Sequence, residues 1–318
     1  MSDVGLCLSC FADRPTDQAL AATRELGITT IDLPLDSTFR LRPFGRDASR
    51  EDISALTRTV RDSEIAVACV SNSRDCQLIM GPYGEHTNGV LADDAAAKKA
   101  HGYRHAEEAI RVAEALDAPL VRLFFGCPDF GRWLSWPNSV VSWADNIDEF
   151  VTSVGPLAEL ASSVGRTLCI EPHPKQVAYN AQSLMDCLSG LQPHSLGVCF
   201  DPANVGALGY DPVDFLRVIN TVPVALHAKD LEVWGSAGPP LGKGWVSYGP
   251  QAPIRFRSVP WGTLDWRAIF SLLSEEGFHG PVFIEHEDLL TSRTRGVREA
   301  RTFLSSLINR EPEAERWW

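Results

Sequence analysis

The hydrophobic positions of this chain follow two alternating spacings. Short runs of consecutive apolar, β-branched and aromatic residues alternate with longer stretches in which apolar residues recur at helical spacing. The short runs predict strands over Val4–Phe11, Thr29–Leu35, Ile65–Asn72, Leu120–Gly126, Thr167–His173, Leu196–Asp201, Val224–Asp230 and Val282–Glu287. The stretches between and after them predict helices over Thr16–Leu26, Ser49–Asp62, Asp94–Leu116, Trp143–Ser163, Ala181–Ser189, Pro212–Asn220, Leu264–Glu276 and Ser292–Asn309.

Repeated strand-then-helix units indicate parallel strands joined by helical crossovers. Eight such units are the number that closes a barrel, so the pattern predicts an α/β fold, a single (β/α)8 TIM barrel. The alternative is a doubly wound open sheet, which a glycine-rich turn after the first strand would favour. The segment Cys10-Phe11-Ala12-Asp13 is not such a turn. We expect one catalytic barrel domain over residues 1–310 and a C-terminal tail over residues 311–318, either disordered or engaged in a subunit contact.

The extra length of the chain lies in three long connections, Ser73–Asp93, Cys127–Ser142 and Leu231–Thr263. Each follows a predicted strand and precedes a helix, so each is expected as a long βα loop over the C-terminal face, where active sites of this fold are built. The last two connections contain five tryptophans, which could wall a small-molecule pocket or serve only in loop packing. These are Trp133, Trp136, Trp234, Trp245 and Trp261.

Four side chains that can bind metal ions stand at the ends of four successive predicted strands. They are Glu171, Asp201, His227 and Glu285. Consecutive strands of a barrel are neighbours, so these side chains can converge on one point if they all face inward. Carboxylates and imidazole suit Mn²⁺, Mg²⁺, Co²⁺ or Zn²⁺. The sequence therefore predicts one divalent ion at this end of the barrel, with Mn²⁺ favoured.

The two-residue period of a strand adds further candidates beside these four. His173 lies two positions after Glu171, and Lys229 two positions after His227, so each can share a face with a metal ligand. We expect His173 to be catalytic, either by binding a substrate hydroxyl or by acting as a base. Lys229 is expected to bind substrate by stabilising an oxyanion, unless it only pairs with Asp230 or Glu287.

The net charge of the chain narrows the range of molecules that it is expected to bind. The formal net charge is −12 and the sequence pI is about 5.1, which argues against binding to nucleic acid or to an anionic membrane surface. No apolar stretch is long enough to span a bilayer, and residues 1–14 lack the pattern of a signal peptide. We expect a cytoplasmic enzyme for a small-molecule carbohydrate, while a homo-oligomer or a partner subunit stays open. The pair Cys7 and Cys10 lacks a second pair at zinc-site spacing, so we interpret it as structural.

At this point the chain resembles the xylose-isomerase-like TIM-barrel superfamily, the sugar phosphate isomerase/epimerase group, and in particular its inosose-dehydratase-like members. The similarity is sharpest in Gly126-Cys127-Pro128, Glu171-Pro172-His173-Pro174, Phe200-Asp201-Pro202, His227-Ala228-Lys229-Asp230 and Ile284-Glu285-His286-Glu287-Asp288. The resemblance implies that Glu171, Asp201, His227 and Glu285 bind one divalent ion, and that Glu171 and Glu285 flank the carbon whose proton is exchanged. Many members have a histidine three residues after the aspartate, whereas this chain has Asn204, which can bind a sugar hydroxyl but cannot shuttle a proton.

These residues favour a metal-dependent isomerase or epimerase that acts on a keto-sugar or cyclitol through an enediolate. The alternative is a metal-dependent lyase on a 3-oxo-sugar, either an inosose-type dehydratase or an enzyme that removes an aglycone from a 3-oxo-glycoside or C-glycoside. An endonuclease-like repair enzyme would require a basic rim and additional histidine ligands. A non-catalytic binding subunit is disfavoured by the intact acid–base residues.

Overall fold

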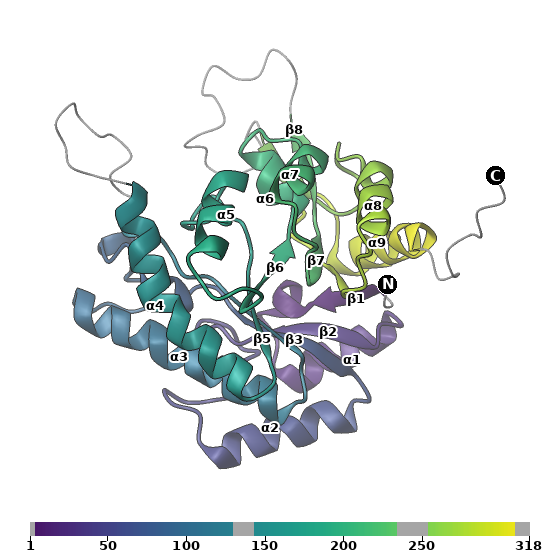
Figure 1. The fold of residues 1–318 in the computed structure, drawn as a ribbon. Coiled ribbons are helices and arrows are strands. Elements are labelled where there is room, and N and C mark those ends of the chain that lie inside the picture. The colour runs from purple at the N-terminus through teal and green to yellow at the C-terminus, as the bar shows by residue number, and fades with distance from the viewer. Residues whose placement is uncertain (1–3, 130–142, 234–253, 309–318) are drawn as a thin grey trace.

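A computed structural model describes residues 4–129, 143–233 and 254–308 of the chain. Eight parallel strands form a closed barrel in the order β1-β10-β7-β6-β5-β4-β3-β2, as predicted, and helices surround it (Figure 1). The barrel strands are β1 (Val4–Cys7), β2 (Thr30–Pro34), β3 (Ala66–Asn72), β4 (Leu120–Leu123), β5 (Thr167–Ile170), β6 (Leu196–Phe200), β7 (Ala225–Ala228) and β10 (Val282–Ile284). The closed ring excludes the open doubly wound sheet.

The helices predicted from periodicity are present with small shifts at their ends. They are α1 (Thr16–Glu25), α2 (Arg50–Asp62), α3 (Ala95–Ala115), α4 (Trp143–Ser163), α5 (Ala181–Ser189), α7 (Pro212–Ile219), α8 (Trp266–Glu275) and α9 (Arg293–Leu307). Several begin at side-chain caps that satisfy free backbone N–H groups. Ser49 and Asp52 form a capping box at α2, and Asp94 accepts from Ala97 N at α3.

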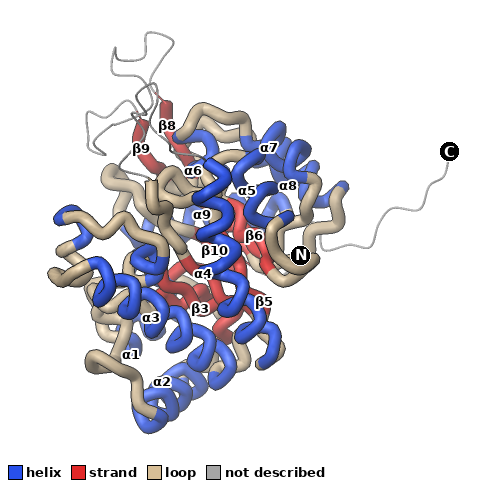
Figure 2. Tube along the Cα trace, turned by 60° about the vertical axis from the view of Figure 1, so that its left-hand side comes forward, coloured by secondary structure: helices blue, strands red, loops and turns tan. Residues whose placement is uncertain are grey.

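Three features depart from the prediction. The first strand ends at Cys7, and Leu8–Phe11 form a short 3-10 helix, η1. A further short helix, α6 (Pro202–Ala207), begins directly after β6. The segment after β7 forms an antiparallel hairpin of β8 (Asp230–Val233) and β9 (Ile254–Arg257), which lies apart from the barrel strands (Figure 2).

The barrel interior is divided into an apolar layer and an ionic layer above it. The apolar layer consists of small and hydrophobic side chains: Cys7, Cys69, Leu120, Cys169, Cys199, Ala225 and Phe283. Two positions further along six of these strands stand Ser71, Arg122, Glu171, Asp201, His227 and Glu285, all buried. Because the side-chain period of a strand is two, these residues face the same interior at the carboxyl ends of the strands. The larger hydrophobic core lies between the barrel and its helices.

Two further findings bear on the predicted partners and cysteines. Among the described helices, none is both long and apolar enough to cross a membrane. All eight cysteines are buried thiols, including Cys7 and Cys10.

Candidate metal centre

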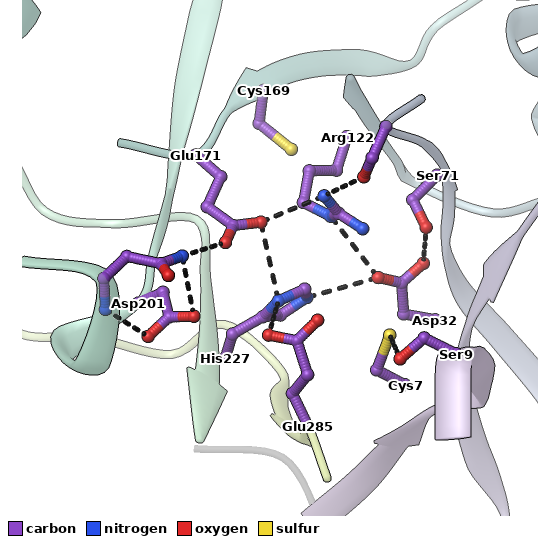
Figure 3. A network of polar contacts seen from close by, with 12 residues as sticks. Cys7, Ser9, Asp32, Ser71, Arg122, Cys169, Glu171, Asp201, His227 and Glu285 are labelled. Carbon is purple, nitrogen blue, oxygen red and sulfur yellow. Dashed lines mark hydrogen bonds and ion pairs between the residues drawn. The ribbon is translucent and has the colours of Figure 1, made fainter. Parts of the chain in front are cut away.

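The four predicted metal ligands lie together at the carboxyl ends of four neighbouring strands. Glu171, Asp201, His227 and Glu285 each offer one ligand atom, and these atoms all lie within 4.8 Å of one another. They come from β5, β6, β7 and β10, which are consecutive in the barrel order. Figure 3 shows the four side chains pointing toward one another.

The chain fixes Asp201 by using one of its oxygens as a helix cap. Oδ1 accepts hydrogen bonds from the backbone N–H groups of Ala203 (2.8 Å) and Asn204 (3.1 Å), and Pro202 supplies the first turn of α6. Oδ2 remains for the centre of the site, where it accepts from Asn204 Nδ2 at 2.9 Å. Asp201 therefore presents a single oxygen of fixed orientation.

Glu171 is held by two donors of different charge. Asn204 Nδ2 donates to its Oε1 at 2.7 Å, and Arg122 Nη1 lies 2.9 Å from its Oε2. The amide nitrogen of Asn204 therefore binds two of the proposed ligands, which gives this residue a positioning role in addition to the predicted contact with substrate. Oδ1 of Asn204 has no hydrogen-bond partner among the described residues.

Asp32 contacts the nitrogen of His227 that faces away from Glu171 and Glu285, and it determines that this nitrogen carries a proton. His227 Nε2 lies 3.2 Å from Asp32 Oδ2, and Ser71 donates to Asp32 Oδ1 at 2.6 Å. Burial opposes ionisation, but Arg122 and His227 hold the pKa of Asp32 below its usual range. An ionised Asp32 can only accept, so Nε2 carries the proton and donates. Burial opposes a charged ring, but Cys199, Glu285 and Glu171 raise the pKa of His227 well above its usual value, so Nδ1 holds a second proton when no metal ion is bound.

His227 Nδ1 is the observation that tests whether these residues fit a metal ion. This atom is fully buried and has no hydrogen-bond partner among the described residues, although Glu285 Oε2 lies 3.4 Å and Glu171 Oε2 3.6 Å away. A buried imidazole nitrogen that faces two carboxylates requires a positive charge between them, which a proton or a metal ion can supply. Imidazole whose other nitrogen donates to a carboxylate is also the usual arrangement of a histidine ligand.

The charge of the site supports the same fit. Four buried carboxylates, from Asp32, Glu171, Asp201 and Glu285, face the two permanent cations of Arg122 and Lys229, which leaves a formal charge of −2 around His227. The proton that His227 takes up offsets part of this charge when no metal ion is bound. Burial, together with the neighbouring charges of Glu171 and Glu285, raises the pKa of Asp201 to about 7. Burial likewise raises the pKa of Glu171, against the opposing charge of Arg122. One divalent cation would balance the excess.

His173 lies beside this group and has a defined tautomer. Its ring contacts Phe124 at a centroid distance of 4.8 Å, and its Nδ1 accepts from the backbone N–H of Lys175 at 3.1 Å. Nε2 therefore carries the ring proton. Burial and the charge of Lys229 lower the pKa of His173, which favours the neutral ring. Of its two predicted roles, the structure favours donation to a substrate hydroxyl.

Lys229 contacts the site directly. Its Nζ lies 3.0 Å from Asp201 Oδ2, 2.9 Å from Glu285 Oε2 and 3.1 Å from Glu287 Oε2. The predicted pairing with Glu287 is present. The predicted alternative, Asp230, instead accepts from Trp266 Nε1 at 2.9 Å and from backbone N–H groups.

Sequence reasoning missed Asp32 and Arg122. Each carried a signal, because a lone charge stands inside an otherwise apolar strand run, in Thr30–Pro34 and in Leu120–Leu123. Arg122 is also in phase with Leu120 in the barrel interior. Among the tryptophans predicted for a pocket wall, Trp261 is exposed and donates to Glu299 on α9. Trp133, Trp136, Trp234 and Trp245, like the tail over residues 311–318, lie outside the described residues.

Comparison with known proteins gives the family. A model described as a xylose isomerase-like TIM barrel matches residues 20–307. The chain belongs to this family. A curated relative, the uncharacterized protein YfiH of Bacillus subtilis (strain 168), is 22% identical over 232 residues, which cover 64% of this chain and 70% of the relative.

Solved structures of low identity share the fold over nearly the whole chain. The IolI protein with a bound zinc atom has a TM-score of 0.69 at 12% identity, covering 96% of this chain and 98% of that one. A xylose isomerase-like TIM barrel protein from Mycobacterium smegmatis, in complex with magnesium, has a TM-score of 0.68 at 16% identity, with coverage of 96% and 98%. A D-tagatose 3-epimerase-like protein has a TM-score of 0.66 at 15% identity, with coverage of 96% and 97%.

Proposed function

We propose that this chain is a divalent-metal-dependent isomerase or epimerase of a keto-sugar or cyclitol. In this proposal Glu171, Asp201, His227 and Glu285 hold one divalent ion, with Mn²⁺ favoured and Mg²⁺, Co²⁺ or Zn²⁺ possible. The observation that carries the proposal is the convergence of these four buried residues: their ligand atoms lie within 4.8 Å of one another, and oxygens of Glu285 and Glu171 lie 3.4 and 3.6 Å from His227 Nδ1. The family, and neighbours that are named as an epimerase-like protein or that contain zinc or magnesium, support the same class.

The two glutamates are arranged for proton transfer. Oε2 of Glu171 and Oε2 of Glu285 approach His227 Nδ1 from strands β5 and β10, with β6 and β7 between them in the barrel. A divalent ion at this point would polarise a substrate carbonyl and its neighbouring hydroxyl, and so acidify the C–H bond between them. One glutamate then removes the proton and the other returns it, on the other face or on the adjacent carbon. General acid–base participation of this kind contributes roughly 10²–10⁴-fold to the rate.

Arg122, Asn204 and His173 have supporting roles in this proposal. Arg122 and Asn204 fix the two oxygens of Glu171 from opposite sides, which limits its rotation while it exchanges a proton. His173 presents the proton of Nε2 to a substrate hydroxyl. Precise placement of such groups is a large part of enzymatic rate acceleration.

The position of His173 favours a second candidate, a lyase that acts on a 3-oxo-sugar. A donor outside the ligand set can hydrogen-bond to a hydroxyl or an aglycone oxygen and so stabilise it as it leaves the carbon next to the enediolate. The same proton abstraction therefore leads either to exchange or to elimination, depending on whether the substrate carries a leaving group beside the acidified carbon.

One experiment separates these outcomes. Metal-free protein is reconstituted with Mn²⁺ and incubated in deuterated water with keto-sugars, cyclitols and 3-oxo-glycosides, and the products are analysed by NMR and mass spectrometry. An isomerase or epimerase incorporates deuterium and retains the carbon skeleton, whereas a lyase releases water or an aglycone. A His173→Ala variant should lose elimination more than exchange. Absence of both reactions with the whole substrate panel would contradict the proposal.

A further inference from the structure

Lys229 is enclosed by three carboxylates that belong to two different groups. Asp201 and Glu285 are proposed ion ligands, whereas Glu287 stands two residues further along the chain after β10. Lys229 is only 3% exposed, but the side chain of Glu287 is 46% exposed. The ammonium thus lies between an inner, buried pair of acids and an outer acid at the solvent edge.

The inner contacts use the same oxygen atoms that an ion requires. Asp201 Oδ1 is committed to capping α6, so Oδ2 is the oxygen that remains for a metal, and Lys229 Nζ lies 3.0 Å from it. Glu285 Oε2 lies 3.4 Å from His227 Nδ1, closer than Glu171 Oε2 at 3.6 Å, and Lys229 Nζ lies 2.9 Å from it. An ammonium and a divalent ion cannot share these two oxygens at full contact, because like charges at such separations repel strongly.

The outer contacts give the ammonium a second position. Glu287 Oε2 lies 3.1 Å from Nζ and is not one of the proposed ligands. The ring of Phe256 on β9 lies under the same ammonium, with its centroid 4.4 Å away. A carboxylate and an aromatic face together can hold a lysine without the inner pair.

We propose that Lys229 is an internal cation that competes with the divalent ion for Asp201 and Glu285, and that Glu287 retains the ammonium when the ion binds. Ion occupancy then determines where Lys229 lies: against the inner carboxylates without the ion, and against Glu287 and Phe256 with it. This inference rests on the proposed function, because it requires that the four ligands bind an ion. It makes the predicted role of Lys229 toward substrate conditional on the ion.

The test measures Mn²⁺ binding to metal-free full-length protein by isothermal titration calorimetry. Lys229→Met removes the ammonium and keeps a side chain of similar length, so the dissociation constant for Mn²⁺ should fall by about tenfold or more. Glu287→Gln should weaken Mn²⁺ binding in the wild-type background, because the displaced ammonium loses its acceptor. In the Lys229→Met background the same change should have an effect at least threefold smaller, and this difference isolates the coupling between the two residues.

The outcomes distinguish this inference from the proposed function. Unchanged or weaker Mn²⁺ binding in Lys229→Met, with normal binding to the wild type, would overturn the competition and leave the ion site intact. No Mn²⁺ binding to any of the proteins would overturn both. Lys229→Gln repeats the measurement if the methionine variant does not fold, as judged by circular dichroism.

A second measurement follows the lysine itself. Labelling of Lys229 by an amine-reactive reagent, read by mass spectrometry, should become faster when Mn²⁺ is added, since the ammonium moves toward the exposed Glu287. Equal labelling with and without the ion would overturn the two-position arrangement.

Discussion

The candidate metal centre can be compared with a second buried group of histidines and acids, formed by Asp75, His101 and His105. Asp75 follows β3, and the two histidines lie one helical turn apart on α3. The ligand atoms of this second group also lie within 4.8 Å of one another. By distance alone, the two groups are equally good candidates for an ion.

The two groups differ in how fully their polar atoms are hydrogen-bonded. The carboxylate of Asp75 accepts from Ser37 N (2.7 Å), Ser37 Oγ (2.5 Å), Asn72 Nδ2 (3.0 Å) and His101 Nε2 (2.7 Å). The other nitrogen of His101 lies 3.1 Å from Arg104 Nη2, so both ring nitrogens are engaged. In this group His105 Nδ1 is buried without a hydrogen-bond partner among the described residues, and the carboxylate oxygens of Asp75 and Glu108 lie 3.9 Å from it.

Charge separates them further. Glu108, beside His105, is bound at both oxygens by Arg42, at 2.7 and 2.8 Å, and Arg104 adds another cation next to His101. Arg104 is itself paired with Asp47 at 2.9 Å, so the α3 group contains a single carboxylate, Asp75, held by four donors, whereas the metal centre holds four carboxylates around two permanent cations. Clustered ligand atoms therefore indicate an ion site where several buried carboxylates converge without enough cations to compensate them.

Removal of one carboxylate from each group should give the largest difference between the metal centre and the α3 group. Asp201→Asn keeps an oxygen for the α6 cap but loses the carboxylate, so Mn²⁺ affinity should fall by more than about 100-fold, beyond the range typical of outer-shell partners. The matched variant Asp75→Asn should leave both affinity and a stoichiometry of one ion per chain unchanged. Isothermal titration calorimetry measures both. A comparable loss in Asp75→Asn would mean that the α3 group also binds the ion.

The same two variants should change stability in the opposite order. Asp75→Asn places an amide among four donors, and the unfolding free energy of the metal-free protein should fall by roughly 3 kcal/mol. Asp201→Asn should cost less, because the loss of its contacts with Lys229 and Asn204 is offset by relief from the burial and carboxylate repulsion that raise the pKa of Asp201. Urea denaturation followed by circular dichroism measures the difference. If Asp201→Asn were the more destabilising variant, the assignment of uncompensated charge to the metal centre would be wrong.

The barrel and the position of the metal centre could be predicted from the sequence, because the strand pattern determines both. The eight strand runs predicted the barrel, and their last residues placed Glu171, Asp201, His227 and Glu285 at one edge of neighbouring strands. The short helix α6 and the hairpin of β8 and β9 were missed. Six residues are too few to show a helical period, and the two strands of the hairpin are far apart in a long connection.

The sequence did not show which charged side chains pair with one another in the metal centre and in the α3 group. Asp32 follows a β-bulge between Ile31 and Asp32, which shifts the phase of β2 relative to its neighbour, so alternation along the strand does not give its direction. The pairing of Asp75 with His101 joins a loop to a helix 26 residues away. Such contacts depend on how the helices pack on the barrel, which the local pattern does not contain.

Asp32 offers a smaller and sharper test of the metal centre. Asp32→Asn should lower Mn²⁺ affinity by about 10-fold to 100-fold, since the neutral amide no longer enforces the proton on His227 Nε2. Nitrogen NMR of the imidazole in the metal-free protein should show a lower pKa of His227 in the variant than in the wild type, because the hydrogen bond to Asp32 is one of the interactions that raise it. Ser71→Ala, which removes one donor to Asp32, should have a weaker effect of the same sign. Wild-type affinity in Asp32→Asn would contradict the tautomer argument.

The smallest expected effect concerns His105, the unpartnered member of the α3 group. Burial lowers its pKa to about 4, against the opposing charge of Asp75. The unfolded chain binds the proton with a pKa near 6.5. Because the folded pKa is the lower one, His105 contributes stability above pH 6.5 that is lost as the pH falls toward 4. Between pH 7 and pH 5 this loss amounts to about 2 kcal/mol.

His105→Gln removes this titration and leaves the groups that face it, namely His101, Asp75, Glu108 and Arg42. The unfolding free energy of the variant should therefore fall less than that of the wild type between pH 7 and pH 5, in urea denaturation of metal-free protein. A difference that instead favoured the wild type at pH 5 would mean that His105 is protonated in the folded state and paired with Asp75 and Glu108. The α3 group would then hold an additional positive charge, and its contrast with the carboxylate-rich metal centre would be larger still.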